Sequence, residues 1–525
     1  DHRDLHSFPT RRSSDLLVNA DRDFYQSMIA ATQYYDLKNG YTDLPTQLLP
    51  PYLIQKWNSF DENRVQVVDN VRAAVEIAQT NDELYTVIQA DDGLTFAEAY
   101  EKFEKGYSAW EAAFDLKENT GSWVDYNDRF SSTRAVLNDM QLIFWGGSAI
   151  QNSGNSSLVV RNSYIRGETA VQTAPLAGNP GNLLVAGNIR TTLGIGNSEN
   201  VYINSTIVSR NWAALSTDAA EPALKEGQKE LSLYAYGTQA ITMDGGYGAY
   251  SDLFCNLYVF GSHIQAAEIG IISGTYGKVT AGTIEDGENN AVIAANLTDA
   301  DKSLRSDRQL GSVVEGGRNA MMIHSVNLPP YWEYEGYSQD LLPWLHTEII
   351  AHKTLFRTDM SLDKGVSYEP QKQAYIDHTK GSVILIKSTN VNMDMDSCEL
   401  VPDENGTGYL IQTVYNNDTM FMNAVPDGEE YPGICITMKD MDITGDIAHE
   451  DYQRDFLLIL DGSSLSGAVN EYDCDHWIHA AEEEGFTDYS LDESYNTHHC
   501  LKLTLSEGSV WNVTKESHLS KIGRA

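Results

Sequence analysis

Two consecutive stretches near the end of the chain repeat one alternation of apolar and polar positions. Residues 434–438 alternate apolar with smaller or polar side chains, and the alternation resumes at residues 441–447 after a short polar break. A shift of 22 residues lays residues 456–460 and 465–469 over these two segments. Alternation places every second side chain on one face of a strand. A strand, bend and strand unit that recurs without a helix predicts stacked coils of a β-solenoid, because one coil cannot bury its apolar row alone.

Short β-branched and aliphatic runs continue this pattern through most of the chain. They begin at Ser156, Gly181, Asn200, Leu231, Cys255, Ala291, Ala320, Thr347, Ser382, Gly408, Gly433, Phe456 and Cys500. Their uneven spacing predicts a solenoid with loops inserted at some corners, and polar or aromatic excursions are expected at 218–230, 285–312 and 329–343. Asn, Ser, Thr and Gly crowd the intervals, where they favour sharp bends between short strands.

The period is helical before this region, and we predict an α-helical lobe over residues 17–120 and a parallel β-helix over residues 121–520. Thr95 and Glu98 form a capping box, and aromatic residues then recur at spacings of three and four through residue 114. A second helix is predicted over 61–79 and a weaker one over 21–35. An aromatic stripe can stack on sugar rings, but strict helical spacing favours packing in a core.

Both ends of the chain match translated sequencing adapters. Residues 1–16 read DHRDLHSFPTRRSSDL and residues 521–525 read KIGRA, and each corresponds to the conceptual translation of a short-read adapter. We therefore expect the chain to be an internal piece of a longer reading frame assembled from environmental DNA. Both tails are left out of the fold prediction.

The composition excludes some classes of function. The chain has 75 acidic and 36 basic residues, a formal net charge of -39, so the basic stripe that nucleic acid requires is missing. Acidic polysaccharides are disfavoured unless a local basic patch or a bound cation intervenes. The 5 cysteines are scattered without a CxxC pair, which gives no support to a zinc cluster or a disulfide scaffold. No apolar run approaches the length of a membrane helix.

Several phrases resemble known β-helix sequences. They are the NxxI and SxI corners, RNWAALSTD at 210–218, GYLIQTVYNND at 408–418 and GSVWNVTKESHLSKI from Gly508. The chain from about 125 to 520 thereby resembles the right-handed parallel β-helix of the pectin-lyase-like superfamily, and within it the adhesin-type β-helix repeat proteins of gut bacteria. The resemblance implies an all-β solenoid, here with an amino-terminal helical lobe, and an extracellular or cell-surface location.

Enzymes with this fold use clustered carboxylates for hydrolysis, or a calcium-bound acid with a basic residue for elimination. The hydrolase phrases are absent as a set: STD occurs at 216–218, but the adjacent pair Asp91 and Asp92 lies in the predicted lobe. YIDH at 375–378 lacks the arginine-rich partner phrase of a lyase and is attributed to chance. The glycines at 245–248 lack the following helix that a phosphate site needs.

Two acidic pairs are candidates for calcium ligands. Asp394 and Asp396, and Asp440 and Asp442, are each two residues apart and so are predicted to share a strand face. Carboxylates stacked on neighbouring coils could hold calcium. A solvated acidic face is the preferred interpretation.

A second candidate cluster comes from the central coils. Its members are Asp218, Asp244, Asp252, His263 and Glu268. Nothing in their spacing makes them converge, so the sequence assigns no catalytic, cofactor-binding or metal-binding residue and implies no cofactor.

The resulting hypothesis is a non-catalytic adhesin or stalk, secreted or on the cell surface, that presents loops to glycans or a host surface. A polysaccharide lyase or glycoside hydrolase is the alternative, motivated by the fold and the central acidic residues. Passive display of a further domain is a third possibility. An enzyme requires converging carboxylates or a cation site, whereas a stalk requires only a continuous core and adhesive loops.

Overall fold

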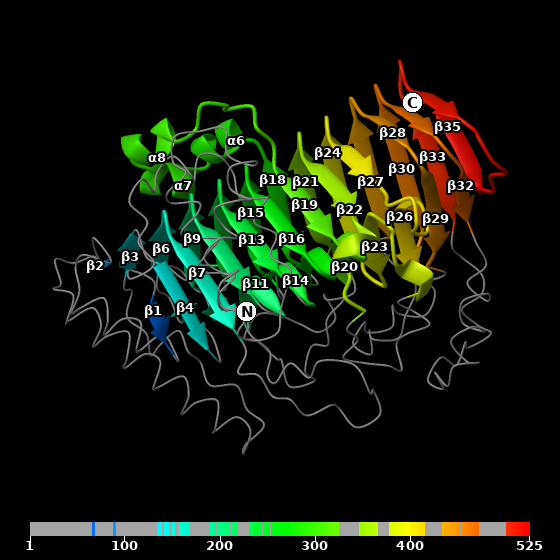
Figure 1. Cartoon of the computed structure of the whole chain (residues 1–525). Coiled ribbons are helices and arrows are strands. Elements are labelled where there is room, and N and C mark those ends of the chain that lie inside the picture. Colours follow the sequence, from blue (N-terminus) through cyan, green and yellow to red (C-terminus); the bar gives the residue numbers. More distant parts are fainter. Residues whose placement is uncertain are drawn as a thin grey trace, which may run out of the picture.

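The computed structural model describes eighteen segments of the chain. They are residues 66–68, 88–90, 134–138, 141–145, 150–152, 157–168, 190–195, 198–209, 212–218, 230–243, 245–251, 254–274, 276–324, 346–365, 377–414, 433–451, 454–471 and 500–524. Within these segments the chain is mostly β-strand, with a few short helical segments. The strands stack side by side along one axis (Figure 1).

Three long sheets make up most of the stack, and a fourth short sheet follows sheet A in the last coils. Sheet A contains β1 (Gln66–Val68), β4 (Gln141–Trp145), β7 (Tyr164–Glu168), β10 (Thr206–Ser209), β13 (Gln239–Thr242), β16 (His263–Ala266), β19 (Val313–Gly316), β22 (Leu355–Thr358) and β25 (Glu399–Val401). Sheet B contains β2 (Ile88–Ala90), β3 (Arg134–Asn138), β6 (Ser157–Arg161), β9 (Glu199–Ile203), β12 (Ser232–Tyr236), β15 (Asn256–Phe260), β18 (Lys278–Gly282), β21 (Thr347–His352), β24 (Val391–Asp396), β27 (Ile434–Lys439), β30 (Phe456–Asp461), β33 (Leu501–Leu505) and β35 (Lys521–Arg524). Sheet C contains β5 (Ile150–Asn152), β8 (Thr192–Ile195), β11 (Ala213–Asp218), β14 (Tyr247–Ser251), β17 (Ile269–Ser273), β20 (Asn319–His324), β23 (Ile384–Lys387), β26 (Tyr409–Val414), β29 (Asp446–Glu450) and β32 (Val469–Glu471). Sheet D contains β28 (Asp442–Thr444), β31 (Ser464–Ser466) and β34 (Val510–Asn512).

From β3 to β32 each coil passes through sheet B, then sheet A or D, then sheet C, and pairs in parallel with the next coil. The 22-residue shift is the observed register, because Ile434 pairs with Phe456, Ile443 with Leu465, and Ile447 with Val469. Among the described strands only β2 and β3 pair antiparallel. The predicted stack of coils is therefore confirmed as a parallel β-helix.

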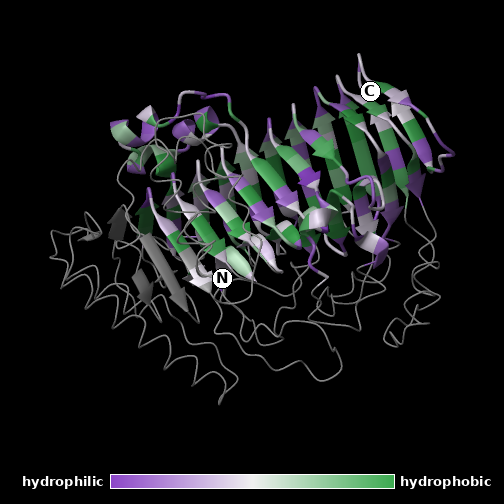
Figure 2. Ribbon diagram, viewed as in Figure 1, coloured by the Kyte–Doolittle hydropathy of each residue, from purple (hydrophilic) through white to green (hydrophobic). Residues whose placement is uncertain are grey.

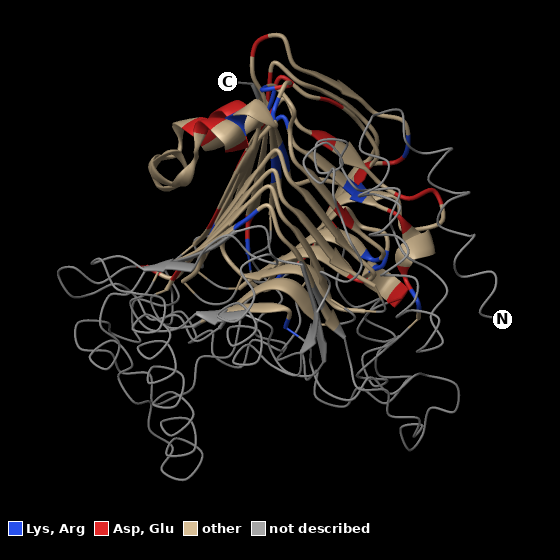
Figure 3. Cartoon of the chain, turned by 60° about the vertical axis from the view of Figure 1, so that its left-hand side comes forward, with Lys and Arg blue, Asp and Glu red and all other residues tan. Residues whose placement is uncertain are grey.

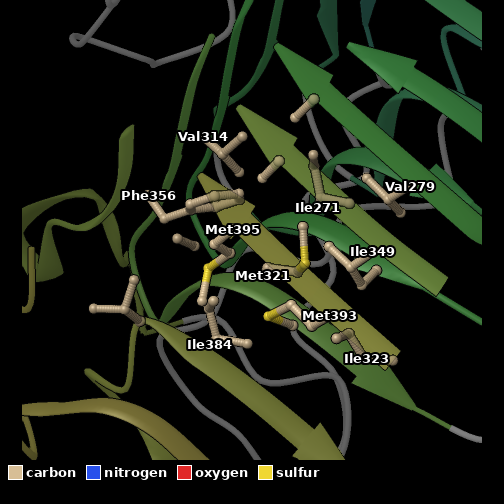
Figure 4. Packing of buried hydrophobic residues seen from close by; sticks show 14 of the residues in the cluster. Ile271, Val279, Val314, Met321, Ile323, Ile349, Phe356, Ile384, Met393 and Met395 are labelled. Carbon is tan, nitrogen blue, oxygen red and sulfur yellow. The ribbon is translucent and has the colours of Figure 1, made fainter. Parts of the chain in front are cut away.

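The inward side chains of successive coils form one continuous core. Val279, Ile349 and Met393 are neighbours on β18, β21 and β24, and all three are fully buried (Figure 4). Apolar and polar positions alternate along the strands as this arrangement requires (Figure 2). Each such side chain contributes roughly 1.5–3 kcal/mol by leaving water, which is why stacking stabilises coils that are unstable singly.

The bend from sheet B to sheet A uses the predicted corner residues. Asn162 and Asn204 turn the chain with positive φ angles of 50° and 49°. At this corner, a hydroxyl bonds the preceding coil: Ser205 Oγ accepts from Ser163 N at 3.2 Å, and Thr238 Oγ1 accepts from Ser205 N at 3.4 Å. The ladder continues through Ser262 and ties adjacent corners together.

A helical insert between β18 and β19 covers part of the outer face of sheet B. It consists of α6 (Ile284–Asn289), α7 (Ala291–Asn296) and α8 (Asp299–Ser303). Ile284 and Ile293 join a second small core on sheet B, and Arg305 donates from Nε to Asn204 Oδ1 at 2.9 Å. Figure 3 shows the insert beside the stacked strands, with its acidic and basic positions coloured.

The insert corrects one part of the sequence prediction. The excursion at 285–312 is present, but the strand run predicted at Ala291 is wrong, because these residues form α7. Asn290 caps that helix by accepting from the backbone N–H groups of Val292 and Ile293, and its alanine-rich sequence has high helix propensity.

Most of the predicted helical lobe lies outside the described residues, including the aromatic stripe through residue 114. Within the helix predicted at 61–79, residues Gln66–Val68 instead form β1, which pairs with β4, so the helix prediction is wrong at these three positions. Among the tails, residues 1–16 lie outside the described segments. Residues 521–524 form β35, which pairs with β33.

Candidate binding site on sheet A and its corner with sheet C

The outer face of sheet A carries two rows of side chains. Ile264, Val314 and Phe356 point into the core, so the residues on either side of them point outward. The first outward row runs from Thr206 through Gln239 to His263. The second row contains Val208, Ile241, Gln265, Glu315 and Arg357.

Glu315 is the centre of a polar network in the second row. Its buried carboxylate accepts from Gln265 Nε2 at 2.7 Å and from Arg357 Nε at 2.7 Å, and Arg357 Nη2 also contacts it. Burial alone would raise the pKa of Glu315, but the His263, Gln265 and Arg357 side chains hold that pKa below its usual range. Glu315 is therefore a buried anion whose charge is balanced by Arg357.

The corner from sheet A to sheet C places one residue of each coil in a column. The residues of this column each directly precede a strand of sheet C: Trp212, Gly246, Glu268 and Arg318. Backbone hydrogen bonds link neighbouring coils at this corner. Tyr247 N donates to Trp212 O at 2.5 Å, and Arg318 N donates to Glu268 O at 2.7 Å. Gly246 has φ +86°, and a Cβ there would lie 2.2 Å from Trp212 O. Glycine is therefore required beside the tryptophan.

Charged residues gather at the Glu268 and Arg318 positions of this column. Arg318 Nη1 donates to Glu268 Oε2 at 3.3 Å, its Nε lies 3.4 Å from Asp363 Oδ2, and Lys380 Nζ lies 2.9 Å from the same Asp363 oxygen. Burial raises the pKa of Glu268. Against the effect of burial, Arg318 and Lys380 hold the pKa of Asp363 below its usual range. One guanidinium thus joins two carboxylates whose pKa values shift in opposite directions.

Aromatic residues gather at the Trp212 end of this column. The Trp212 ring lies 5.4 Å from that of Tyr247 and 5.6 Å from that of Tyr250, and the Arg190 guanidinium lies 5.2 Å from the Trp212 ring. Trp212 adopts φ +61°, an unusual conformation for a bulky residue. Its indole Nε1 is buried and has no hydrogen-bond partner. We call Arg190, Trp212, Tyr247 and Tyr250 the aromatic corner.

The structure brings together only part of the candidate cluster from the sequence. His263 begins β16 and faces Glu315, whereas Glu268 lies two residues beyond the end of that strand and faces Arg318. Asp218 is the last residue of β11, and its side chain lies outside the described part of the chain. Asp244 and Asp252 also lie outside the described residues.

The two acidic pairs do not form stacked carboxylates. Asp394 has Ile350 and Thr437 as its neighbours on adjacent strands, and Asp396 has His352 and Lys439. Lys439 Nζ lies 2.8 Å from Asp396 Oδ2.

The second acidic pair does not share a strand face. Asp440 occupies a bend with φ +52°, and only Asp442 lies on a strand, so the predicted shared face is wrong there. Across the described segments, no group of three or more His, Cys, Asp or Glu residues has metal-binding geometry.

One motif dismissed in the sequence has a defined contact. His378, the last residue of YIDH, places Nε2 2.6 Å from Glu450 Oε2, and the Glu450 carboxylate is buried on sheet C. The contact ties the short helical segment at 377–379 to the outer face of sheet C. The two residues lie 72 positions apart, so no local signal in the sequence announces the pair.

Comparisons with known proteins add no family assignment. The chain matches no protein-family model. Its comparisons with curated proteins and with solved structures find no significant similarity. Among the described helices, none is both long and apolar enough to span a membrane.

Acid sensitivity follows from the lowered pKa values of Glu315 and Asp363. Such groups stabilise the folded state above the ordinary carboxyl pKa of about 4, and this contribution is lost as pH falls through their lowered values. We expect the melting temperature to decrease when the pH is lowered below about 4. Glu315→Gln should make this decrease shallower, and it should lower the free energy of unfolding at pH 7 by about 1.5–3 kcal/mol. Calorimetry across pH 3–7 measures both effects.

Glu399→Gln is the control for this experiment, because Glu399 is exposed on β25. Its melting temperature should follow the parent at every pH. If the melting temperature of Glu315→Gln decreased as steeply at acid pH as that of the parent, Glu315 would not be the source of the acid sensitivity.

Proposed function

We propose that the chain is part of a non-catalytic, extracellular or cell-surface β-helix protein, an adhesin or stalk, that binds glycans at the aromatic corner. The observation that supports this most is the half-buried group of Trp212, Tyr247 and Tyr250. Aromatic rings offer an apolar face to the C–H side of a sugar, and nearby polar groups can bond its hydroxyls. A rigid stack of coils holds these rings in place.

The proposal places the fold among right-handed parallel β-helices of the pectin-lyase-like type. The sequence phrases quoted above favour this type, and parallel strands joined by crossovers are right-handed in nearly all proteins. The adhesin role rests on the resemblance and on the glycan-binding chemistry of the corner. Glycans of a host or of a neighbouring surface are the proposed partners.

The carboxylates at this site favour binding over bond cleavage. A glycosidase needs two carboxyl groups facing the scissile bond from opposite sides. Here Glu268 and Asp363 both face Arg318, and Glu315 faces Arg357. Buried carboxylates that are paired with cations serve first to offset charge within the protein.

A hydrolase or lyase is the alternative, and one observation favours it. The pKa of Glu268 is raised by burial while that of Asp363 is lowered, and an acid–base pair in an enzyme shows such a divergence. If this alternative holds, Glu268→Gln abolishes release of reducing or unsaturated sugar ends. If the binding proposal holds, no such ends form in the parent.

Replacing Trp212 with alanine tests the binding proposal. We expect at least about tenfold weaker binding to glycans on an array and in calorimetry, because the central ring of the aromatic corner is lost. Tyr276→Ala is a matched control: Tyr276 also has a positive φ, +63°, and packs on Phe254 at 5.4 Å away from this corner. Equal glycan affinity of folded Trp212→Ala and the parent would refute the proposal.

A further inference from the structure

The apolar core is uncovered at the coil of residues 500–524, which lies at one end of the stack (Figure 1). Ile522 on β35 is the register neighbour of Leu503 on β33, so it continues the inward row of sheet B. Leu503 and its neighbour Leu458 on β30 are both 0% exposed, whereas Ile522 is 57% exposed. Among the described strands, none lies beyond β35 to cover Ile522.

Other large apolar side chains of this coil are also exposed. Five large apolar residues are exposed within the described segments, and three of them belong to this coil: Val510 at 55%, Val513 at 51% and Ile522. Trp511 and Leu519 pack on the core but are only partly buried. We call Val510, Trp511, Val513, Leu519 and Ile522 the end face. Exposed apolar side chains that gather in one region are typical of an association surface.

The strands of the end face also have open edges. In the described part of the chain, β34 pairs only with β31 and β35 only with β33, and both strands are the last of their sheets. The open edge of a strand presents N–H and C=O groups that pair readily with another strand. The end face therefore offers backbone hydrogen bonds together with apolar contact.

The charge of this coil differs from that of the chain as a whole. Residues 500–524 carry a formal charge of +2, from the four basic residues Lys502, Lys515, Lys521 and Arg524 and the two acidic residues Glu507 and Glu516. The whole chain carries -39. Two copies of so acidic a chain repel each other. The end face lies on a coil without this negative charge, so it is a place where two copies can meet.

The size of the coil suits an interface between two copies. Each side of a stable protein interface contributes roughly 20–30 residues, and residues 500–524 number 25. Contact between identical end faces is related by a two-fold axis, so the association closes at a dimer instead of growing into a fibre. Each copy then covers the uncovered core layer of the other with a layer of the same kind.

We infer that two copies of this chain associate end to end through the end face. The inference goes beyond the proposed function and does not depend on it. For a glycan-binding protein the consequence is useful, because a dimer presents two aromatic corners, and two linked sites bind a surface more tightly than one.

The test is the mass of the full chain in solution, measured by sedimentation and light scattering over a range of concentrations. The parent should reach twice the 58.3 kDa of one chain. The double variant Val510→Lys with Val513→Lys should weaken dimer formation at least about a hundredfold, because it places four like charges in one apolar interface. Both valines are exposed, so the variant should keep the β-structure of the parent, which circular dichroism checks.

Val401→Lys is the matched control, since Val401 is also an exposed valine, at 40%, but lies on β25 inside the stack. It should form dimers as the parent does. A parent that stays monomeric at every concentration would overturn the inference and leave the end face to another polypeptide. A dimer that the double variant does not weaken would also overturn it.

Removal of residues 521–525 separates this surface from the segment that matches a sequencing adapter. The shortened chain loses β35, and Leu503 on β33 becomes the last inward residue of its row. We expect it still to form dimers, because an apolar layer and an open strand edge remain. If the shortened chain were monomeric, the association would belong to the adapter-derived strand alone, and the inference would be overturned.

Discussion

Gly467→Ala is expected to lower the free energy of unfolding by about 3 kcal/mol or more, or to prevent the last coils from folding. A Cβ at Gly467 would lie 1.8 Å from the carbonyl oxygen of Gly445, the residue stacked directly above it. That oxygen belongs to backbone and cannot move freely, because Gly445 N donates to Ser466 O at 3.0 Å. Overpacking against fixed backbone is among the most destabilising single changes. Chemical denaturation measures the loss.

Gly508→Ala provides the control for this prediction. Gly508 has φ +87° but no atom within 4 Å of an added Cβ, so alanine there costs only the strain of the backbone, about 1 kcal/mol. Equal stability of Gly467→Ala and the parent would contradict the 22-residue stacking of these coils.

Arg454→Met is expected to cost about 3–5 kcal/mol. Arg454 Nη1 lies 3.0 Å from Asp451 Oδ2, and both side chains are 0% exposed. Arg454 Nε also donates to Asn390 Oδ1, two coils away, at 3.2 Å. Removing the guanidinium leaves the Asp451 carboxylate buried without its cation, which is far costlier than losing an exposed ion pair. Thermal unfolding at pH 7 measures the change.

The double variant Arg454→Met with Asp451→Asn separates the two contributions. It should recover part of the lost stability, because the buried charge is gone as well. A double variant no more stable than Arg454→Met alone would show that packing of the arginine, rather than its charge, stabilises this corner.

The repeat was predictable where coils follow each other without insertion. In the coil that begins at Ile434 and the one that begins at Phe456, the first two strands have equal lengths of 6 and 3 residues. The register could therefore be counted directly, and it is correct. The same counting failed at Ala291. There an apolar segment with a good N-cap belongs to an insert, and its side chains pack on the outside of sheet B instead of in the solenoid core.

The candidate site was only partly predictable because its contacts are distant in sequence. Glu268 was singled out as an acidic residue of the central coils, but its partner Arg318 lies 50 residues away, beyond the helical insert. Glu315 and Arg357 are outward residues of neighbouring strands, yet 42 residues separate them. Without the register of these coils, neither pair could be recognised. Trp212 lay within a quoted phrase, but its neighbours Tyr247 and Tyr250 come from the next coil.

Binding and bond cleavage measured in the same samples test the central proposal most directly. The chain is incubated with neutral oligosaccharides, with and without calcium, and both bound ligand and newly formed reducing or unsaturated ends are recorded. We predict binding that is weakened by Trp212→Ala, with no new ends. Turnover that Glu268→Gln or Asp363→Asn abolishes would contradict a non-catalytic role and identify the corner of sheets A and C as an active site.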